Sequence, residues 1–177
     1  MQFFECKALK EIKLPEGLQS IGVGVFYRTG IKQLTIPGSV VKIDVIDKSI
    51  KLSKPSYLKK FKRDSGAIYY EARATIKASG KKAVTYKASR ITKIKAKTSK
   101  VTIQKGKTTK LQTRVYISKK LKKGYLDPEI LKFTTSNKKV VKVSSKGTIK
   151  GLKKGKATVT VKLRTTGKTY KVNVKVK

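Results

Sequence analysis

The densest group of basic and aromatic side chains in this sequence lies between residues 116 and 125. Lysine ammonium groups attract anions as point charges, and tyrosine rings offer flat surfaces on which a ligand can stack. Such a mixture is typical of a contact for a polyanion or a glycan, and the alternative is a solvated loop, which is the usual role of a charged segment. The candidate contact residues are Tyr116, Lys119, Lys120, Lys122, Lys123 and Tyr125.

No comparable pattern favours catalysis or metal binding. Histidine is absent and Cys6 is the single cysteine, which excludes a His-based triad, an intrachain disulfide and a Cys/His zinc site. Gly106-Lys107-Thr108 ends like a phosphate-binding P-loop, but Val101 stands where that loop needs a glycine. The 9 acidic residues offer few of the roughly six to eight oxygen ligands that calcium takes. We expect no enzyme, no metal and no cofactor.

The charge of the chain is extreme and uneven. The 177 residues include 46 basic and 9 acidic ones, for a net charge of +37. Residues 1–48 carry +2, residues 49–90 carry +10 and residues 91–177 carry +25, which indicates units of different origin. Such a field attracts nucleic acid, anionic membrane surfaces or wall polymers. Only 6 basic residues are arginine, so nucleic acid is the least favoured partner.

The elements that must position these residues begin with an internal repeat. Segments starting at Leu9 and Ile31 share one apolar pattern, which predicts short strands at residues 12–14 and 34–36, each ended by a proline. One such rung cannot bury its own apolar face, so rungs stack on each other. The matched pairs, each 22 residues apart, are Leu9 and Ile31, Ile12 and Leu34, Leu14 and Ile36, Pro15 and Pro37, Leu18 and Val40, and Ile21 and Ile43.

The pattern from Phe3 through Cys6 to Gly22 resembles the BspA-type leucine-rich repeat of bacterial surface proteins. A second rung follows, in which a Thr-Gly pair replaces the cysteine. The resemblance implies that Cys6 is a small core residue. After Ile43 the pattern loses its expected glycine and phenylalanine, so we expect the array to end there. The array also starts within a rung, which favours a piece of a longer exported protein.

Residues 91–177 are rich in alternating and β-branched segments separated by glycine and asparagine, which favours a β-sandwich. Alternation in the last strand turns its valines inward and its polar residues toward water, where the lysines discourage edge-to-edge pairing. The inward residues are Val172, Val174 and Val176, and the outward ones are Lys171, Asn173, Lys175 and Lys177. The expected strands cover residues 101–104, 110–118, 130–136, 139–144, 157–163 and 169–177.

Residues 135–162 resemble the signature of the group-2 bacterial immunoglobulin-like domain, and residues 91–115 resemble its usual opening. The resemblance implies an immunoglobulin-like sandwich, which serves as a stalk in some proteins and as an adhesive module in others. A longer insertion at residues 116–131 departs from the pattern and holds the candidate contact.

Between the two units, residues 49–61 fit a degenerate rung or a cap, and the segments flanking residues 79–82 predict a β-hairpin.

We therefore expect an all-β chain of three parts: leucine-rich-repeat rungs at 1–48, a β-rich bridging segment at 49–90 and an immunoglobulin-like domain at 91–177. The expected function is non-catalytic display and adhesion at a cell surface, in an extracellular protein of a Gram-positive bacterium. The alternative is binding of wall teichoic acid or glycosaminoglycan through the lysine-rich surface, with nucleic acid less favoured. We expect a monomer with no membrane span, whose partners are proteins, glycans or an anionic wall polymer.

Overall fold

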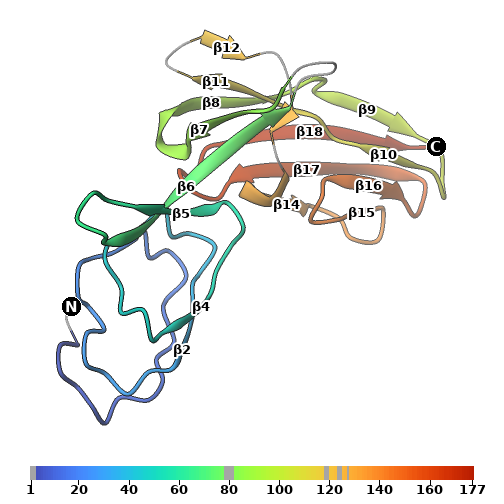
Figure 1. The fold of residues 1–177 in the computed structure, drawn as a ribbon. Coiled ribbons are helices and arrows are strands. Elements are labelled where there is room, and N and C mark those ends of the chain that lie inside the picture. The colour runs from blue at the N-terminus through green and yellow to red at the C-terminus, as the bar shows by residue number, and fades with distance from the viewer. Residues whose placement is uncertain (1–2, 78–81, 118–119, 123–124, 127) are drawn as a thin grey trace. The chain divides into compact units, whose positions relative to one another are not determined.

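The computed structural model describes the chain except residues 1–2, 78–81, 118–119, 123–124 and 127, and it gives the backbone alone at residues 77, 120–122 and 125. The chain is all-β, as the sequence predicted (Figure 1). It divides into two compact units, Met1–Arg73 and Ala74–Lys177, and the division falls inside strand β6 (Ile68–Lys77).

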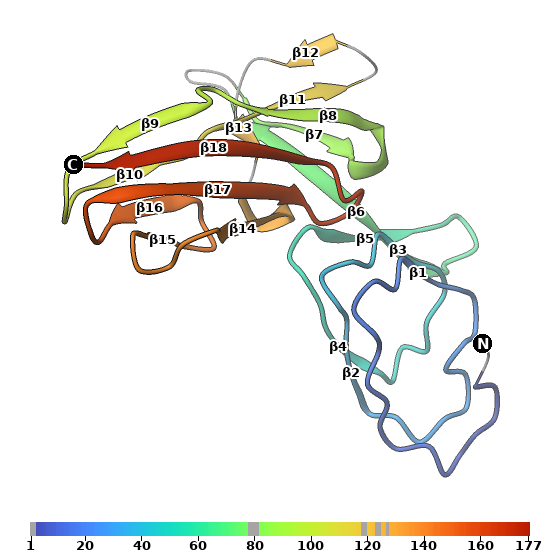
Figure 2. The ribbon, with the colours of Figure 1, turned by 180° about the vertical axis from the view of Figure 1, so that it is seen from behind.

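Unit 1 is a stack of short parallel strands. Strand β1 pairs with β3 so that Ile21 stands beside Ile43, which confirms the 22-residue repeat in the register itself (Figure 2). Strand β2 pairs with β4 in the same parallel sense, with Gln33 beside Lys51. The strands of unit 1 that precede β6 are β1 (Ser20–Ile21), β2 (Gln33–Thr35), β3 (Lys42–Ile43), β4 (Lys51–Ser53) and β5 (Leu58–Lys62).

The apolar residues of the two repeats are buried to different degrees. Ile31, Leu34 and Val40 of the second rung are at most 1% exposed. Their counterparts in the first rung are only half-buried, for example Leu9 and Ile12. The second rung is covered on both sides, whereas within the described chain the first rung is covered on one side. Burial in this unit therefore comes from neighbouring rungs, as expected of a repeat stack.

Two expectations for this unit are wrong: a strand at residues 12–14, and the end of the repeat stack at Ile43. Residues 12–14 form no strand, and no backbone hydrogen-bond partner is described for them. The stack also does not end at Ile43, because β4 adds a further parallel strand beside β2. The antiparallel pair β5 and β6 follows, and β6 also pairs antiparallel with β3 through Tyr70 and Ile43. Residues 49–61 thus include the parallel strand β4 and most of the antiparallel strand β5.

The expectation that Cys6 is a core residue is also wrong, because its side chain is exposed. Its sulfhydryl lies 3.7 Å from the carbonyl oxygen of Phe4, a residue of its own turn. In the described chain no rung lies beyond the first one to cover Cys6. The side chain of Cys6 is therefore exposed although the residue matches the family pattern.

Unit 2 is a sandwich of antiparallel sheets with one parallel strand pair at an edge. The larger sheet has the order β14-β17-β18-β9, and smaller sheets have the orders β10-β16-β15 and β12-β11-β8 (Figure 1). Strand β7 pairs with β6, as the hairpin prediction requires, although the predicted turn lies largely outside the described residues. The elements are β7 (Val84–Lys87), η1 (Ala88–Arg90), β8 (Ile91–Ala96), β9 (Lys100–Ile103), β10 (Thr108–Lys110), β11 (Thr113–Ile117), β12 (Lys120–Lys122), β13 (Tyr125–Leu126), η2 (Pro128–Ile130), β14 (Leu131–Thr135), β15 (Val141–Val143), β16 (Thr148–Gly151), β17 (Gly155–Leu163) and β18 (Thr169–Val176).

The segment 110–118, predicted as one strand, is interrupted at Leu111 and Gln112. Strand β10 before the break pairs with β16, and β11 after it pairs with β8, so the chain changes sheets here. Backbone hydrogen bonds hold the crossing on both sides, from Leu111 N to Gly147 O and from Lys97 N to Gln112 O. Alternation continues through the crossing in the sequence, which is why the sequence alone did not reveal it.

The core of unit 2 lies between the inward faces of these sheets. The predicted inward residues of β18, Val172, Val174 and Val176, are at most 2% exposed. On β17, which pairs with β18 along its length, Val159 and Val161 are fully buried. The predicted outward residues of β18 are exposed, so the alternation in this strand is confirmed.

Candidate functional site

The outward surface of the sheet β14-β17-β18-β9 is polar and cationic throughout. Because side chains alternate along a strand, the residues that bury valine inward place lysine, threonine and asparagine on the opposite side. None of the outward residues on these strands is acidic or aromatic. We call this surface the lysine face, and it consists of Lys100, Thr102, Lys132, Thr134, Lys156, Thr158, Thr160, Lys162, Thr169, Lys171, Asn173 and Lys175.

The strand register places like charges directly opposite each other on this face. Lys156 of β17 stands beside Lys175 of β18, and Lys132 of β14 stands beside Lys162 of β17. Adjacent strands lie about 4.8 Å apart, and like charges directly opposite on a sheet are destabilising. An anion between two such lysines relieves this repulsion, so the arrangement favours an anionic ligand.

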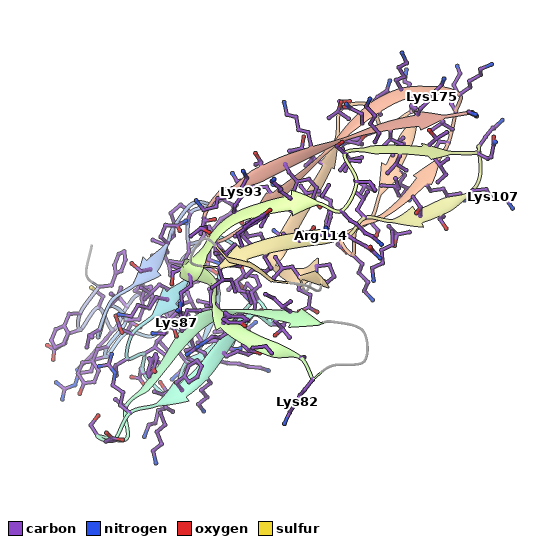
Figure 3. The ribbon with its side chains drawn as sticks, turned by 90° about the horizontal axis from the view of Figure 1, so that it is seen from above. Lys82, Lys87, Lys93, Lys107, Arg114 and Lys175 are labelled. Carbon is purple, nitrogen blue, oxygen red and sulfur yellow. The ribbon has the colours of Figure 1, made fainter. Side chains whose placement is uncertain are left out.

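Acidic residues that could neutralise the lysine face are scarce in unit 2. Between residues 74 and 177 the sequence has 32 basic residues and only two acidic ones, Asp127 and Glu129. By contrast, the ion pairs described for the chain join residues of unit 1: Glu5 with Arg28, Asp44 with Lys42 and with Arg63, and Glu71 with Arg73. Figure 3 shows labelled basic residues of unit 2, among them Lys87, Lys107 and Lys175, well separated from one another along the unit. The cationic field of unit 2 is therefore broad.

Within the lysine face a depression crosses β9, β18 and β17. Two rows of cross-strand neighbours form it, one through Thr102, Lys175 and Lys156 and the other through Lys100, Asn173 and Thr158. Ser136 lies at its edge just after β14. The full lining is Lys100, Val101, Thr102, Ser136, Lys156, Ala157, Thr158, Asn173, Val174 and Lys175.

Hydrogen bonds inside the depression orient its neutral polar groups. The Oγ1 hydroxyl of Thr158 donates a hydrogen bond to Oδ1 of Asn173 at 3.4 Å. Because the amide oxygen of Asn173 is engaged in this bond, its amide nitrogen is the atom that can donate to a ligand. The backbone N–H of Thr158 donates to Oγ of Ser136 at 2.9 Å, so the Ser136 hydroxyl hydrogen can point elsewhere. Together with three ammonium groups, these donors give the depression an excess of hydrogen-bond donors, which suits an anion.

The structure divides the candidate contact predicted in the 116–131 insertion between two strand pairs. Tyr116 lies on β11, half-buried, with the ammonium of Lys95 5.6 Å from its ring centroid. Lys120 and Lys122 lie on β12, where the register sets Leu121 opposite Tyr116. Tyr125 lies on β13, which pairs with β6. Lys119 and Lys123 lie outside the described residues, so this cluster stays a prediction.

Sequence reasoning identified three residues of the lysine face, Lys171, Asn173 and Lys175, and missed its assembly. The outward residues of β18 were recognised, but only as protection against edge pairing. The same alternation runs through Lys156, Thr158, Thr160 and Lys162 of β17, and it could have been noted. Their position beside the residues of β18 depends on a register that alternation does not determine.

Comparison with known families finds one similar family for each end of the chain. Residues 1–53 match the model of the BspA type leucine rich repeat region (6 copies). Residues 90–174 match the model of the bacterial Ig-like domain (group 2). Both resemblances seen in the sequence are confirmed, in that order along the chain. No curated protein matches the chain.

Both families are non-catalytic and typical of bacterial surface proteins. Among the described residues, no group of three or more His, Cys, Asp or Glu side chains is placed to hold a metal ion. In the same part of the chain, no helix has the length and apolar character needed to cross a membrane.

Proposed function

We propose that this chain is a non-catalytic display and adhesion module at the surface of a Gram-positive bacterium. The observation that carries the proposal is the tandem of a BspA-type repeat region and a bacterial immunoglobulin-like domain, both typical of surface proteins. In this proposal the repeat unit presents a binding face and the sandwich serves as a stalk. A single cysteine, and therefore no intrachain disulfide, fits such a host.

An exposed aromatic group in unit 1 supports the idea of a binding face. The rings of Phe4 and Tyr27 stack with centroids 5.4 Å apart, and they are 51% and 42% exposed. Val23, at 61%, is also exposed in this unit. Exposed aromatic and apolar residues of this kind are enriched at protein contacts.

Display and adhesion are tested separately. Antibodies raised against the chain should label intact cells of the source bacterium, and labelling that needs cell lysis would contradict surface display. Beads coated with the chain should adhere to intact bacterial or host cells more than beads coated with the F4A/Y27A variant. Equal adhesion of the two kinds of bead would remove the aromatic group from the proposal.

The second candidate function is polyanion binding by unit 2, and the lysine face favours it because its residues include no acid. Electrostatic binding of this kind weakens steeply as salt rises. Retention of the protein on immobilised heparin or teichoic acid should therefore fall across a salt gradient, and retention without salt dependence would exclude this function. A gel shift with single- and double-stranded nucleic acid at physiological salt tests the less favoured nucleic-acid alternative.

A further inference from the structure

The depression on the lysine face has a composition that selects among anions. We propose that it binds the phosphate groups of a polyol-phosphate polymer, the chemistry of a wall teichoic acid, lying extended across β9, β18 and β17. This inference rests on the polyanion-binding function proposed above. It adds where on unit 2 the polymer binds and which class of polymer it is.

Two lysines of the depression are placed so that one phosphate can lie between them and contact both. Lys156 and Lys175 are directly opposite across the β17 and β18 pair, and Lys100 stands one row away beside Asn173. Each ammonium carries three donors and no fixed planar fork, so it neutralises a tetrahedral phosphate as a point charge. A phosphate between Lys156 and Lys175 replaces the repulsion of two cations with two attractive contacts.

The neutral groups suit the linker between phosphates. Hydroxyls of Thr102, Ser136 and Thr158 and the amide nitrogen of Asn173 surround the lysines. Such groups exchange hydrogen bonds with the hydroxyls of a polyol, and the hydrogen bond of Thr158 to Asn173 holds the amide in a donating orientation.

The lining also argues against other anionic polymers. No residue that lines the depression is aromatic, so it has no platform for a nucleic acid base. The depression is open to solvent and not enclosed, which fits a linear polymer better than an enclosed small ligand.

The main test measures binding of a fluorescently labelled poly(glycerol phosphate) chain by anisotropy, with the whole chain as the protein. The K156Q/K175Q variant removes the bridged pair, and the K142Q/K150Q variant is its matched control. Lys142 and Lys150 are also exposed and directly opposite, on β15 and β16, but they lie outside the depression. Thermal unfolding followed by circular dichroism checks that both variants fold.

We expect K156Q/K175Q to bind roughly tenfold more weakly, because charge-assisted contacts are lost. The slope of log K against log salt should fall by about two, about one for each lysine removed. The K142Q/K150Q control should keep nearly all of the affinity. Equal losses in both variants would overturn the inference and leave a diffuse attraction, in which case polyanion binding itself would still stand.

Two further outcomes separate the ligand from the function. If the unchanged protein binds neither poly(glycerol phosphate) nor heparin at low salt, the polyanion-binding candidate fails altogether. If it binds heparin in a salt-dependent way but not poly(glycerol phosphate), the ligand class is wrong although the function survives. Titration with glycerol phosphate should also shift the NMR signals of the Asn173 side-chain amide and of the Lys156 and Lys175 backbone amides. Shifts confined to other residues would overturn the assigned place.

Discussion

Gly30 lies so close to Lys7 that a β-carbon on it would come within 2.5 Å of the Lys7 carbonyl oxygen. The carbonyl oxygen of Leu9 would be only 3.2 Å away. These backbone atoms belong to the first rung and Gly30 to the second, so the close approach is part of how the rungs stack. Main-chain atoms cannot move aside as the end of a flexible side chain can.

The Gly30→Ala substitution should therefore destabilise the repeat unit, by about 1–3 kcal/mol, as overpacked sites do. Gly22→Ala is the matched control, because its new β-carbon would meet only Val25 Cγ2 at an ordinary 3.7 Å. Urea unfolding and hydrogen exchange of the unit 1 amides measure the effect. If the two alanine variants were equally stable, the close stacking described here would be incorrect.

A second prediction concerns Tyr170, whose hydroxyl lies 2.6 Å from Oγ1 of the buried Thr113. Burial raises the pKa of Tyr170 above its ordinary value of 10.0, although the hydrogen bond to Thr113 lowers it somewhat. The Tyr170→Phe variant leaves the Thr113 hydroxyl without this partner and should cost about 1 kcal/mol of stability at neutral pH.

The pH dependence of that cost has a definite sign. A group whose folded pKa is raised contributes stability below its unfolded pKa and loses it as pH rises through the folded pKa. The advantage of the unchanged protein over Tyr170→Phe should thus shrink above about pH 10, the reference value for tyrosine. Urea unfolding at neutral and alkaline pH measures it, and the Thr113→Val variant, which keeps the phenol, should retain the alkaline loss. A constant difference between protein and variant across this range would contradict the raised pKa.

A third prediction uses the like-charged pair Lys132 and Lys162, which stand opposite on β14 and β17. The Lys132→Glu substitution converts repulsion into attraction and should raise the free energy of unfolding by about 0.2–1 kcal/mol at low salt. High salt should reduce the gain. Lys138→Glu makes the same charge change in an exposed turn. If Lys138→Glu raised the free energy of unfolding by the same amount, the effect would come from the lower net charge alone and not from the Lys132 and Lys162 pair.

A fourth prediction tests the exposure of Cys6. An exposed thiol should react with a disulfide reagent such as Ellman's reagent in the native protein at nearly the rate seen in urea. A buried core thiol would instead react much more slowly until the protein unfolds. Strong protection in the native protein would restore the core assignment that the family pattern implied.

Local patterns in the sequence were sufficient for much of the fold. The alternation of Val172, Val174 and Val176 with lysines predicted which side of β18 is buried, and the structure confirms it. The 22-residue spacing of Ile21 and Ile43 predicted stacked rungs, and these residues are partners in a parallel strand pair. Both features depend on periods within one segment, which side-chain alternation and repeat length impose directly.

Features that join distant segments were decided only by the tertiary structure. The register of β17 and β18 places Lys156 beside Lys175. The fold also brings Thr113 within hydrogen-bond distance of Tyr170, which is 57 residues away in the sequence. Cys6 matched its family pattern and is nevertheless exposed, because burial depends on what covers a residue and not on the residue itself. Periodicity tells which side of a strand is apolar. Which polar residues share a surface depends on strand pairing, because register and order are set by packing across the whole unit.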